Sequence, residues 1–158
     1  MTPDVATSVG YGPESVMKSW RFLQWFDDVT VELEGLEGSD KVLTATTKTT
    51  ATFTAETLRN SFPRLYSSHK GSRSAILADK LLGQRFVFHG KTVFNWDHTR
   101  GRVSSVQIQN DLLSPMVFML RSLEDAIQVY QGALMDLNGH VKREGGCSQY
   151  INRGHRLP

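Results

Sequence analysis

The sequence predicts an α+β domain in which a strongly curved antiparallel sheet carries helices packed on one face. Apolar and polar residues alternate with a period of two over 29–34 and 42–54, and the pattern returns over 86–89, 92–96 and 102–112. Segments with helical spacing precede, separate and follow these stretches. Because short turns join successive strands, neighbours in the chain are expected to pair in the antiparallel sense.

The first segment is poor in large apolar residues and then becomes strongly aromatic. Residues 1–13 are expected to form a flexible lead-in, and apolar residues at helical spacing predict a helix over about 14–26. Trp20, Trp25 and Phe26 place rings on more than one side of this helix. They are therefore expected either to be buried in the core or to form an interaction surface.

Two strands open the sheet. Residues 29–34 alternate between apolar and acidic or hydroxyl side chains, as in a half-solvated strand. Small and acidic residues over 35–40 predict the turn that follows. Residues 42–54 contain many threonines, whose restricted χ1 favours an extended backbone.

The middle of the chain reads as helices followed by a hairpin. Thr54 or Thr57 can cap a short helix that Pro63 ends, and Ser74 can cap a second one that stops at Gly83. Two strands are then expected to turn at residues 90–91. Another turn leads into a last long strand over 102–112.

Two helices are expected after the last strand. Ser114 and Pro115 start a helical turn, and Ser122 caps the helix that follows. An apolar stripe on the second helix is expected to pack on the sheet or on a partner; it consists of Leu123, Ile127, Tyr130 and Leu134. The prediction is a single domain over 14–137 and a flexible tail over 138–158.

Composition bounds the class of protein. The chain has 158 residues, 39% hydrophobic and 22% charged, with a net charge of +2. These values indicate one globular domain without the electrostatic footprint of a nucleic-acid binder. The single cysteine, Cys147, excludes an intrachain disulfide, so a reduced compartment is expected. Neither a signal peptide nor a membrane span is expected.

A candidate pocket is expected around the end of the last strand. Asp111 shares one strand face with Gln107 and Gln109, and His89 is the one histidine inside an expected strand. A buried carboxylate with a raised pKa can transfer protons, but the preferred interpretation is that Asp111 caps the turn toward Ser114, because the segment that follows needs a structural start signal. The sequence therefore assigns no catalytic residue. The histidines show no metal-ligand spacing, so neither a metal nor a cofactor is expected.

The segment Phe26-Asp-Asp-Val29 before a long hairpin resembles the start of the nuclear transport factor 2-like superfamily, which includes SnoaL-like cyclases. The later stretches Val93-Phe-Asn-Trp-Asp97 and Arg102-Val103 resemble that family's later strands. The resemblance covers roughly 17–112. It implies a cone-shaped domain, here with the opening helix of the usual fold short or absent.

Other runs resemble a domain C-terminal to the zipper in oomycete, Phytophthora-type, basic leucine zipper transcription factors. They are Val31-Glu-Leu-Glu34, Thr57-Leu-Arg59, Leu81-Leu-Gly-Gln-Arg85, Asp111-Leu-Leu-Ser-Pro-Met116 and Ser122-Leu-Glu-Asp125. This resemblance implies a relative of transcription regulators that acts in the nucleus, with the cytoplasm as the alternative location. The chain has no basic region and no sustained heptad repeat, so direct sequence-specific DNA contact is not expected.

Two classes of function follow from these observations. The first is a non-catalytic regulatory domain, not an enzyme, that binds a protein partner or forms a homodimer. The alternative is a small hydratase, isomerase or cyclase-like enzyme, or a sensor of a small ligand, that uses the pocket of the cone. An open pocket inside the cone would favour the alternative, and a cone filled by aromatic side chains would favour the first.

Overall fold

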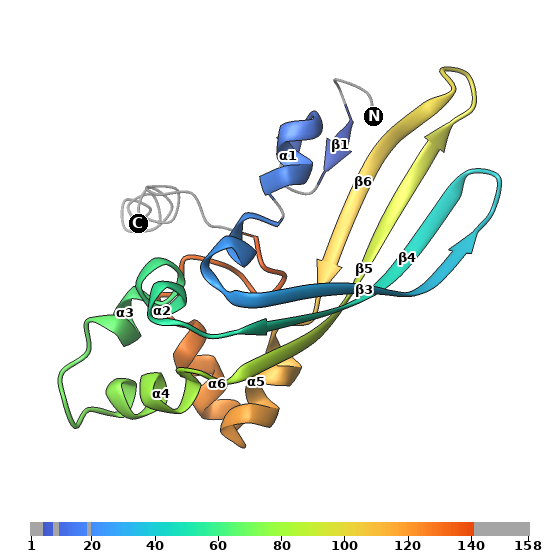
Figure 1. Cartoon of the computed structure of the whole chain (residues 1–158). Helices are drawn as coiled ribbons and strands as arrows, with labels where there is room; N and C mark the ends of the chain where they lie inside the picture. The colour runs from blue at the N-terminus through green and yellow to red at the C-terminus, as the bar shows by residue number, and fades with distance from the viewer. Residues whose placement is uncertain (1–4, 8–9, 19, 141–158) are drawn as a thin grey trace, which may run out of the picture.

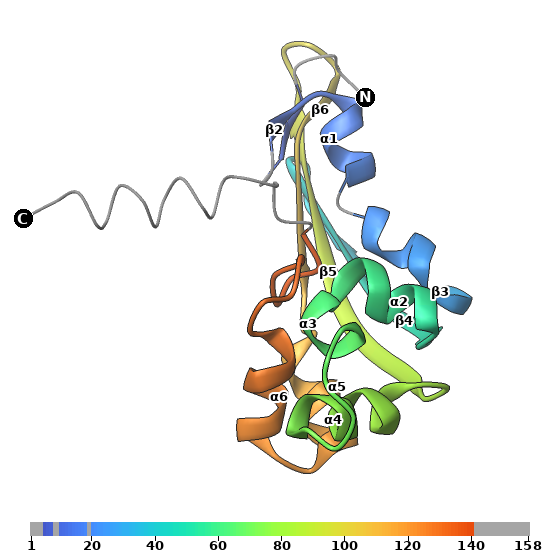
Figure 2. The same ribbon diagram turned by 90° about the vertical axis from the view of Figure 1, so that its left-hand side faces the viewer.

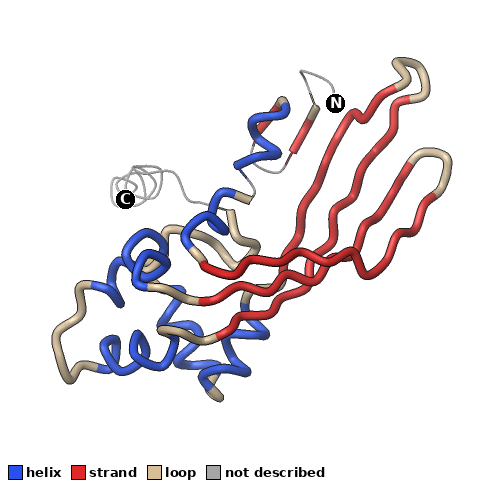
Figure 3. Tube along the Cα trace, viewed as in Figure 1, coloured by secondary structure: helices blue, strands red, loops and turns tan. Residues whose placement is uncertain are grey.

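A computed structural model describes residues 5–7, 10–18 and 20–140 of the chain. Six strands form one open sheet; helices α2 to α6 gather at one end of it, and α1 lies apart from them beside β1 (Figures 1 and 3). The predicted α+β class, with a curved sheet and helices on one face, is confirmed. In chain order the elements are β1 (Ala6–Thr7), β2 (Gly10–Tyr11), α1 (Pro13–Lys18), the 3-10 helix η1 (Arg21–Trp25), β3 (Asp27–Gly38), β4 (Val42–Thr52), α2 (Ala55–Ser61), α3 (Pro63–Tyr66), α4 (Arg73–Leu81), β5 (Arg85–Asp97), β6 (Arg102–Asn110), α5 (Leu113–Leu120) and α6 (Leu123–Tyr130).

The sheet has the strand order β2-β1-β6-β5-β4-β3. The four long strands pair with their chain neighbours in the antiparallel sense, as predicted. The short strand β1 adds to β6 in parallel, where Ala6 pairs with Ser105, and Val5 beside it is fully buried. The described part of the expected lead-in is therefore built into the sheet.

The predicted hairpin at residues 90–91 is wrong, because β5 runs without a break from Arg85 to Asp97. Gly90 pairs with Thr47 on one side and Asn110 on the other. A Cβ at position 90 would overlap the side-chain oxygen of Asn110. Gly90 therefore allows the neighbouring strand to approach closely, and it does not form a turn.

Two other boundaries differ from the prediction. The expected helix over 14–26 is two short pieces, α1 and η1. The expected turn over 35–40 is mostly strand, since β3 continues to Gly38 through a register shift between Leu33 and Gly35. A β-bulge accommodates glycine readily, which explains why Gly35 does not end the strand.

Phenylalanine side chains form the centre of the core, at the end of the sheet that the helices cover. Phe53, at the end of β4, lies 5.2 Å from Phe86 of β5 and 5.1 Å from Phe26, measured between ring centroids. Phe62 of the α2–α3 junction and Phe22 of η1 extend this cluster. All five rings are at most 6% exposed, so they fix the sheet, η1 and the helices to one another.

The helices leave the other half of the sheet uncovered. Figure 2 shows the sheet nearly edge-on, with α4, α5 and α6 around one end. The face that carries Phe86 and Phe88 is called the inner face here. On this face Val31 is exposed beside η1, and farther from the helices the two hairpins expose Leu33, Leu36, Leu43 and Trp96.

The apolar stripe expected on the last helix does not pack as one face. Leu123 and Ile127 are about half exposed, while Ala126 and Val129 are buried in the core. Asp125 is also buried and forms an ion pair with Arg73 of α4. The inward face of α6 is therefore small and partly charged.

We expect Gly90→Ala to destabilise the fold by about 1–3 kcal/mol, because the new methyl group must displace the Asn110 side chain. Urea denaturation measures the change. Gly35→Ala is the matched control: its Cβ would meet Thr46 at an ordinary 3.8 Å, so it should be neutral or slightly stabilising. If Asn110→Ala does not relieve the Gly90→Ala defect, the close approach is not the cause.

Candidate functional site

A hollow lies on the inner face of the sheet, under η1. Its volume is about 430 Å³. Trp20, Phe22 and Leu23 form its wall on the helix side, and residues from four strands form its floor. The floor residues are Val31, Thr47, Thr49, Phe88, Thr92, Ile108 and Asn110.

Strand register brings the floor residues together. Thr49 pairs with Phe88, Thr92 pairs with Ile108, and Gly90 between them pairs with Asn110. Side chains that pair or lie two residues apart share one face of a sheet. Gly90 has no side chain, and the Asn110 side chain occupies the space beside it. The glycine therefore allows the Asn110 amide to lie at the floor of the hollow.

The lining of the hollow is uncharged. None of the ten residues that line it is acidic or basic. Thr49 and Thr92 are 5% and 8% exposed, and their hydroxyl groups can donate or accept hydrogen bonds. Asn110 is positioned by its own amide, which donates to the backbone oxygen of Asn138 at 2.9 Å. The hollow thus offers apolar walls with a few oriented neutral polar groups.

The four residues of the predicted candidate pocket lie elsewhere, on the outer face. Asp111 and His89 line a groove beside α5, whereas Gln107 and Gln109 line a smaller hollow near His140. The structure therefore separates them into two pairs. None of the four lines the inner hollow.

Asp111 has a structural role at the start of α5. The backbone N–H groups of Leu113 and Ser114 donate to Asp111 Oδ1 at 3.2 and 3.0 Å. Hydrogen bonds from the Ser114 side chain and backbone lower the pKa of Asp111 below its ordinary value. A proton donor near neutral pH needs a raised pKa, so the carboxylate is suited to capping and not to acid catalysis.

Half-buried Tyr130 completes this turn. Its hydroxyl donates to the backbone oxygen of Leu112 at 2.6 Å, and burial raises its pKa well above the usual value. The phenol therefore stays protonated and acts as a fixed donor.

The three aromatic residues expected at an interaction surface have different positions. Trp20 is 48% exposed and lines the inner hollow, whereas Phe26 is 6% exposed and belongs to the core. Trp25 is half-buried, and its backbone oxygen accepts hydrogen bonds from the hydroxyls of Thr54 and Thr57. Of the three, Trp20 alone is placed to meet a ligand in the hollow.

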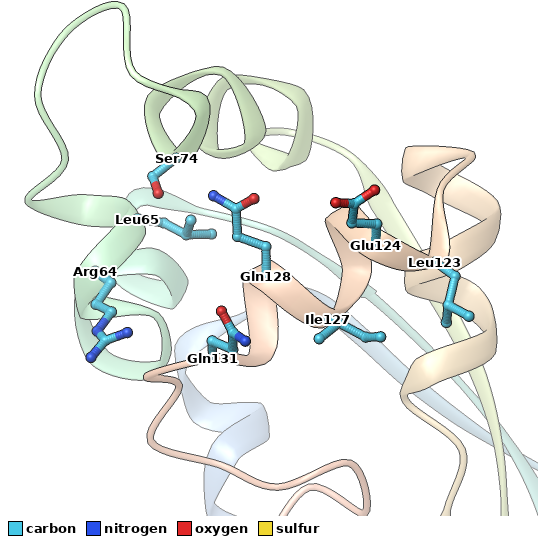
Figure 4. A pocket seen from close by; sticks show the side chains of 8 residues that line it. All are labelled: Arg64, Leu65, Ser74, Leu123, Glu124, Ile127, Gln128 and Gln131. Carbon is cyan, nitrogen blue, oxygen red and sulfur yellow. The ribbon is translucent and has the colours of Figure 1, made fainter.

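A further hollow of about 620 Å³ lies among the helices. Figure 4 shows Leu65 and Ser74 on one side and the side chains of α6, among them Gln128, on the other. Arg64 and Glu124 also line it, and their charges are opposite. This hollow is open to solvent and its lining mixes apolar, polar and charged side chains. The lining residues form no convergent set of groups for catalysis.

The described residues offer neither a metal-binding cluster nor a membrane-spanning helix. Within residues 5–7, 10–18 and 20–140, no three histidine, cysteine, aspartate or glutamate side chains lie close enough to hold a metal ion. No helix in these ranges has the length and apolar character needed to cross a bilayer.

Comparison with solved structures finds proteins of similar shape. A candidate SnoaL-like polyketide cyclase from Jannaschia sp. CCS1 superposes with a TM-score of 0.47 and 19% identity, over 74% of this chain and 71% of that one. IdmH, a candidate polyketide cyclase from Streptomyces antibioticus, gives 0.47 and 15%, over 77% and 82%. AclR, a candidate hydroxylase from Streptomyces galilaeus, gives 0.46 and 15%, over 76% and 68%. No family model and no curated protein matches.

These results bear on two expectations. The prediction that the chain is not an enzyme is contradicted, because the similar structures are named as cyclases and a hydroxylase. The resemblance to oomycete transcription factors has no counterpart among the matches, whereas the SnoaL-like resemblance does. At this level of similarity the structures transfer no activity to this chain. Nuclear or cytoplasmic location stays a prediction.

We expect Asp111→Ala to destabilise the fold by about 1 kcal/mol at pH 7, as for other lost caps, and Asp111→Asn by less, because its amide oxygen can still accept. Since the pKa of Asp111 is lowered, its ionic contribution is present above pH 3.8 and is lost as the pH falls through the lowered value. Urea denaturation at pH 7 and pH 3 measures both effects. Equal losses for Asp111→Ala at the two pH values would contradict this role.

Proposed function

We propose that the chain binds a small, uncharged and largely apolar molecule in the inner hollow and acts on it as a cyclase- or isomerase-type enzyme. The observation that carries this proposal is a hollow of about 430 Å³ with apolar walls and no ionisable side chain among its lining residues. Small-molecule sites commonly measure about 300–1,000 Å³ and combine apolar walls with a few polar groups.

The lining favours a neutral ligand over a charged one. A carboxylate placed against Phe22, Leu23 and Ile108 would lose its hydration without meeting a cation. A carbonyl or hydroxyl group can instead form hydrogen bonds with Thr49, Thr92 or Asn110.

This lining suits a reaction in which a flexible ligand is held in a folded conformation and its carbonyl group is polarised. Apolar walls can hold a chain in a reactive conformation, which lowers the entropic part of the barrier. Hydroxyl and amide donors can stabilise negative charge that develops on a carbonyl oxygen. Because no lining residue titrates near neutral pH, the proton that such a reaction moves would pass through water.

We expect 1-decanol to displace the neutral dye Nile red from the protein at a concentration at least about tenfold lower than decanoate at pH 8, since only the anion must bury an unpaired charge. Fluorescence titration measures both. Equal or stronger displacement by decanoate would contradict an uncharged site.

The position of the site is tested with Thr47→Phe, which places a ring in the hollow. Thr46→Phe is the matched control, because the preceding residue on β4 faces the outer side. We expect the first variant to lose dye binding by at least about tenfold and the second to keep it, with circular dichroism unchanged in both. Equal binding by Thr47→Phe would place the dye elsewhere.

The enzymatic part is tested by hydrogen–deuterium exchange next to the carbonyl of 2-undecanone, followed by NMR in D₂O. Polarisation of the carbonyl should accelerate this exchange in the wild-type protein and not in Thr47→Phe. Binding of the ketone without acceleration would contradict the enzymatic step and leave the binding site intact.

A further inference from the structure

The outer groove beside α5 is a second concave surface, separate from the inner hollow. It measures about 1010 Å³ and lies between the start of β5 and α5. Of its lining residues only Phe88 also lines the inner hollow. The function proposed for the inner hollow does not explain the exposed apolar and basic residues of this groove.

Helix α5 has no polar face toward this groove. Its sequence, Leu-Ser-Pro-Met-Val-Phe-Met-Leu, contains one hydroxyl residue, Ser114. Met116 and Leu120 face the core, but Phe118 is 84% exposed and Val117 is half-buried. A surface helix normally turns polar residues toward solvent. The exposed side of α5 is instead apolar, as is usual for a helix side that packs against another protein surface.

The apolar surface continues onto α6. Leu123 is 55% exposed and lines both the outer groove and the hollow among the helices. Ile127, one turn further, is 48% exposed and lies beside it in Figure 4. Phe118, Leu123 and Ile127 therefore form an apolar strip along α5 and α6 that no described residue covers.

Basic side chains surround the groove. Lys80 and Arg85 line it from α4 and β5, and Arg121 lines it from the link between α5 and α6. The acidic residue of the lining, Asp111, is held by the backbone of α5, and His89 lies 3.1 Å from Glu34 on the neighbouring hairpin. The permanent charges of the lining sum to a positive value.

The charge pattern discriminates between possible occupants. A symmetric contact with a second copy would place these cations against the same cations, which is unfavourable. A lipid surface is flat, whereas the apolar and basic residues here line a recess. A helical segment with apolar residues on one side and carboxylates on the other matches both the apolar lining and the positive charge of the groove.

We propose that this groove docks an acidic amphipathic helix of a partner protein. Its apolar side chains would pack on Phe118, Val117 and Leu123. Its carboxylates would lie beside Arg85 and Arg121, where ion pairs set orientation and the rate of association.

The experiment uses the full chain and two fluorescein-labelled 15-residue helical peptides with the same leucine stripe, one with glutamates and one with lysines on the polar side. In fluorescence anisotropy at low salt, the acidic peptide should bind and the basic one should not. Binding should weaken as salt is raised.

Three variants locate the contact. Phe118→Ser and Arg85→Glu should each weaken binding of the acidic peptide by about tenfold or more, as expected for an anchor residue and a complementary charge. Because both side chains are exposed, neither change should lower the melting temperature appreciably. Ile76→Ser is the control. Ile76 is an exposed residue of α4 that lines neither the outer groove nor the hollow among the helices, so this change should leave peptide binding unchanged.

Several outcomes would overturn the proposal. Binding of neither peptide, or equal binding of both, would remove the charge complementarity on which it rests. Binding to phosphatidylserine vesicles that is lost in Phe118→Ser, with no peptide binding, would make the surface a membrane contact. A dimer in sedimentation that Phe118→Ser converts to a monomer would make it a self-interface.

Discussion

The aromatic cluster at one end of the sheet is the contact on which the rest of the structure depends. Phe53 and Phe86 come from paired strands, Phe22 and Phe26 from η1 and its end, and Phe62 from the helix junction. Full burial of one such ring contributes about 1.5–3 kcal/mol relative to exposure. Since each supporting segment contributes at least one ring, loss of a ring would loosen several elements together.

Clustering of the core at one end explains the unusual exposure of the other end. Strands β3 and β5 have 12 and 13 residues, about twice the usual strand length, and the helices cover only the part near Phe86. Beyond it, Leu33 and Leu36 of β3 remain exposed at the edge of the sheet. Acidic residues such as Glu32 and Glu37 alternate with them, and a bulge interrupts the strand. Charges and bulges on an edge strand oppose pairing with another copy, which accounts for how a long apolar edge is tolerated.

The sequence predicts most elements because their signals are local. Period-two alternation predicts β4 and β6, and capping residues predict α2 and α6: Thr54 accepts from the N–H of Thr57, and Ser122 from that of Asp125. The errors arise where a residue serves a contact distant in sequence. Gly90 indicates a turn until Asn110, twenty residues later, is seen beside it, and strand β1 joins β6 by the pairing of Ala6 with the distant residue Ser105.

The candidate site was harder to predict, for a related physical reason. Acidic residues and histidine attract attention in a sequence because they can transfer protons, and Asp111 and His89 both lie on the outer face. The inner hollow is instead lined by threonines, an asparagine and apolar side chains, which look like ordinary strand residues one at a time. A usable signal was present in the strand register: Thr47, Thr49, Thr92 and Asn110 fall on the same face as buried phenylalanines, where polar residues are rare.

The distribution of charge gives the two faces of the sheet different binding properties. On the inner face, neutral side chains line a small hollow, so the free energy of binding must come from apolar burial and a few hydrogen bonds. On the outer face, Lys80, Arg85 and Arg121 surround exposed Phe118, so electrostatic attraction can add to apolar contact. A change of ionic strength should therefore affect the outer surface strongly and the inner hollow little. Alternation along β5 contributes Arg85 and His89 to the outer surface and Phe88 and Thr92 to the inner one, whereas Lys80, Phe118 and Arg121 come from α4, α5 and the link between α5 and α6.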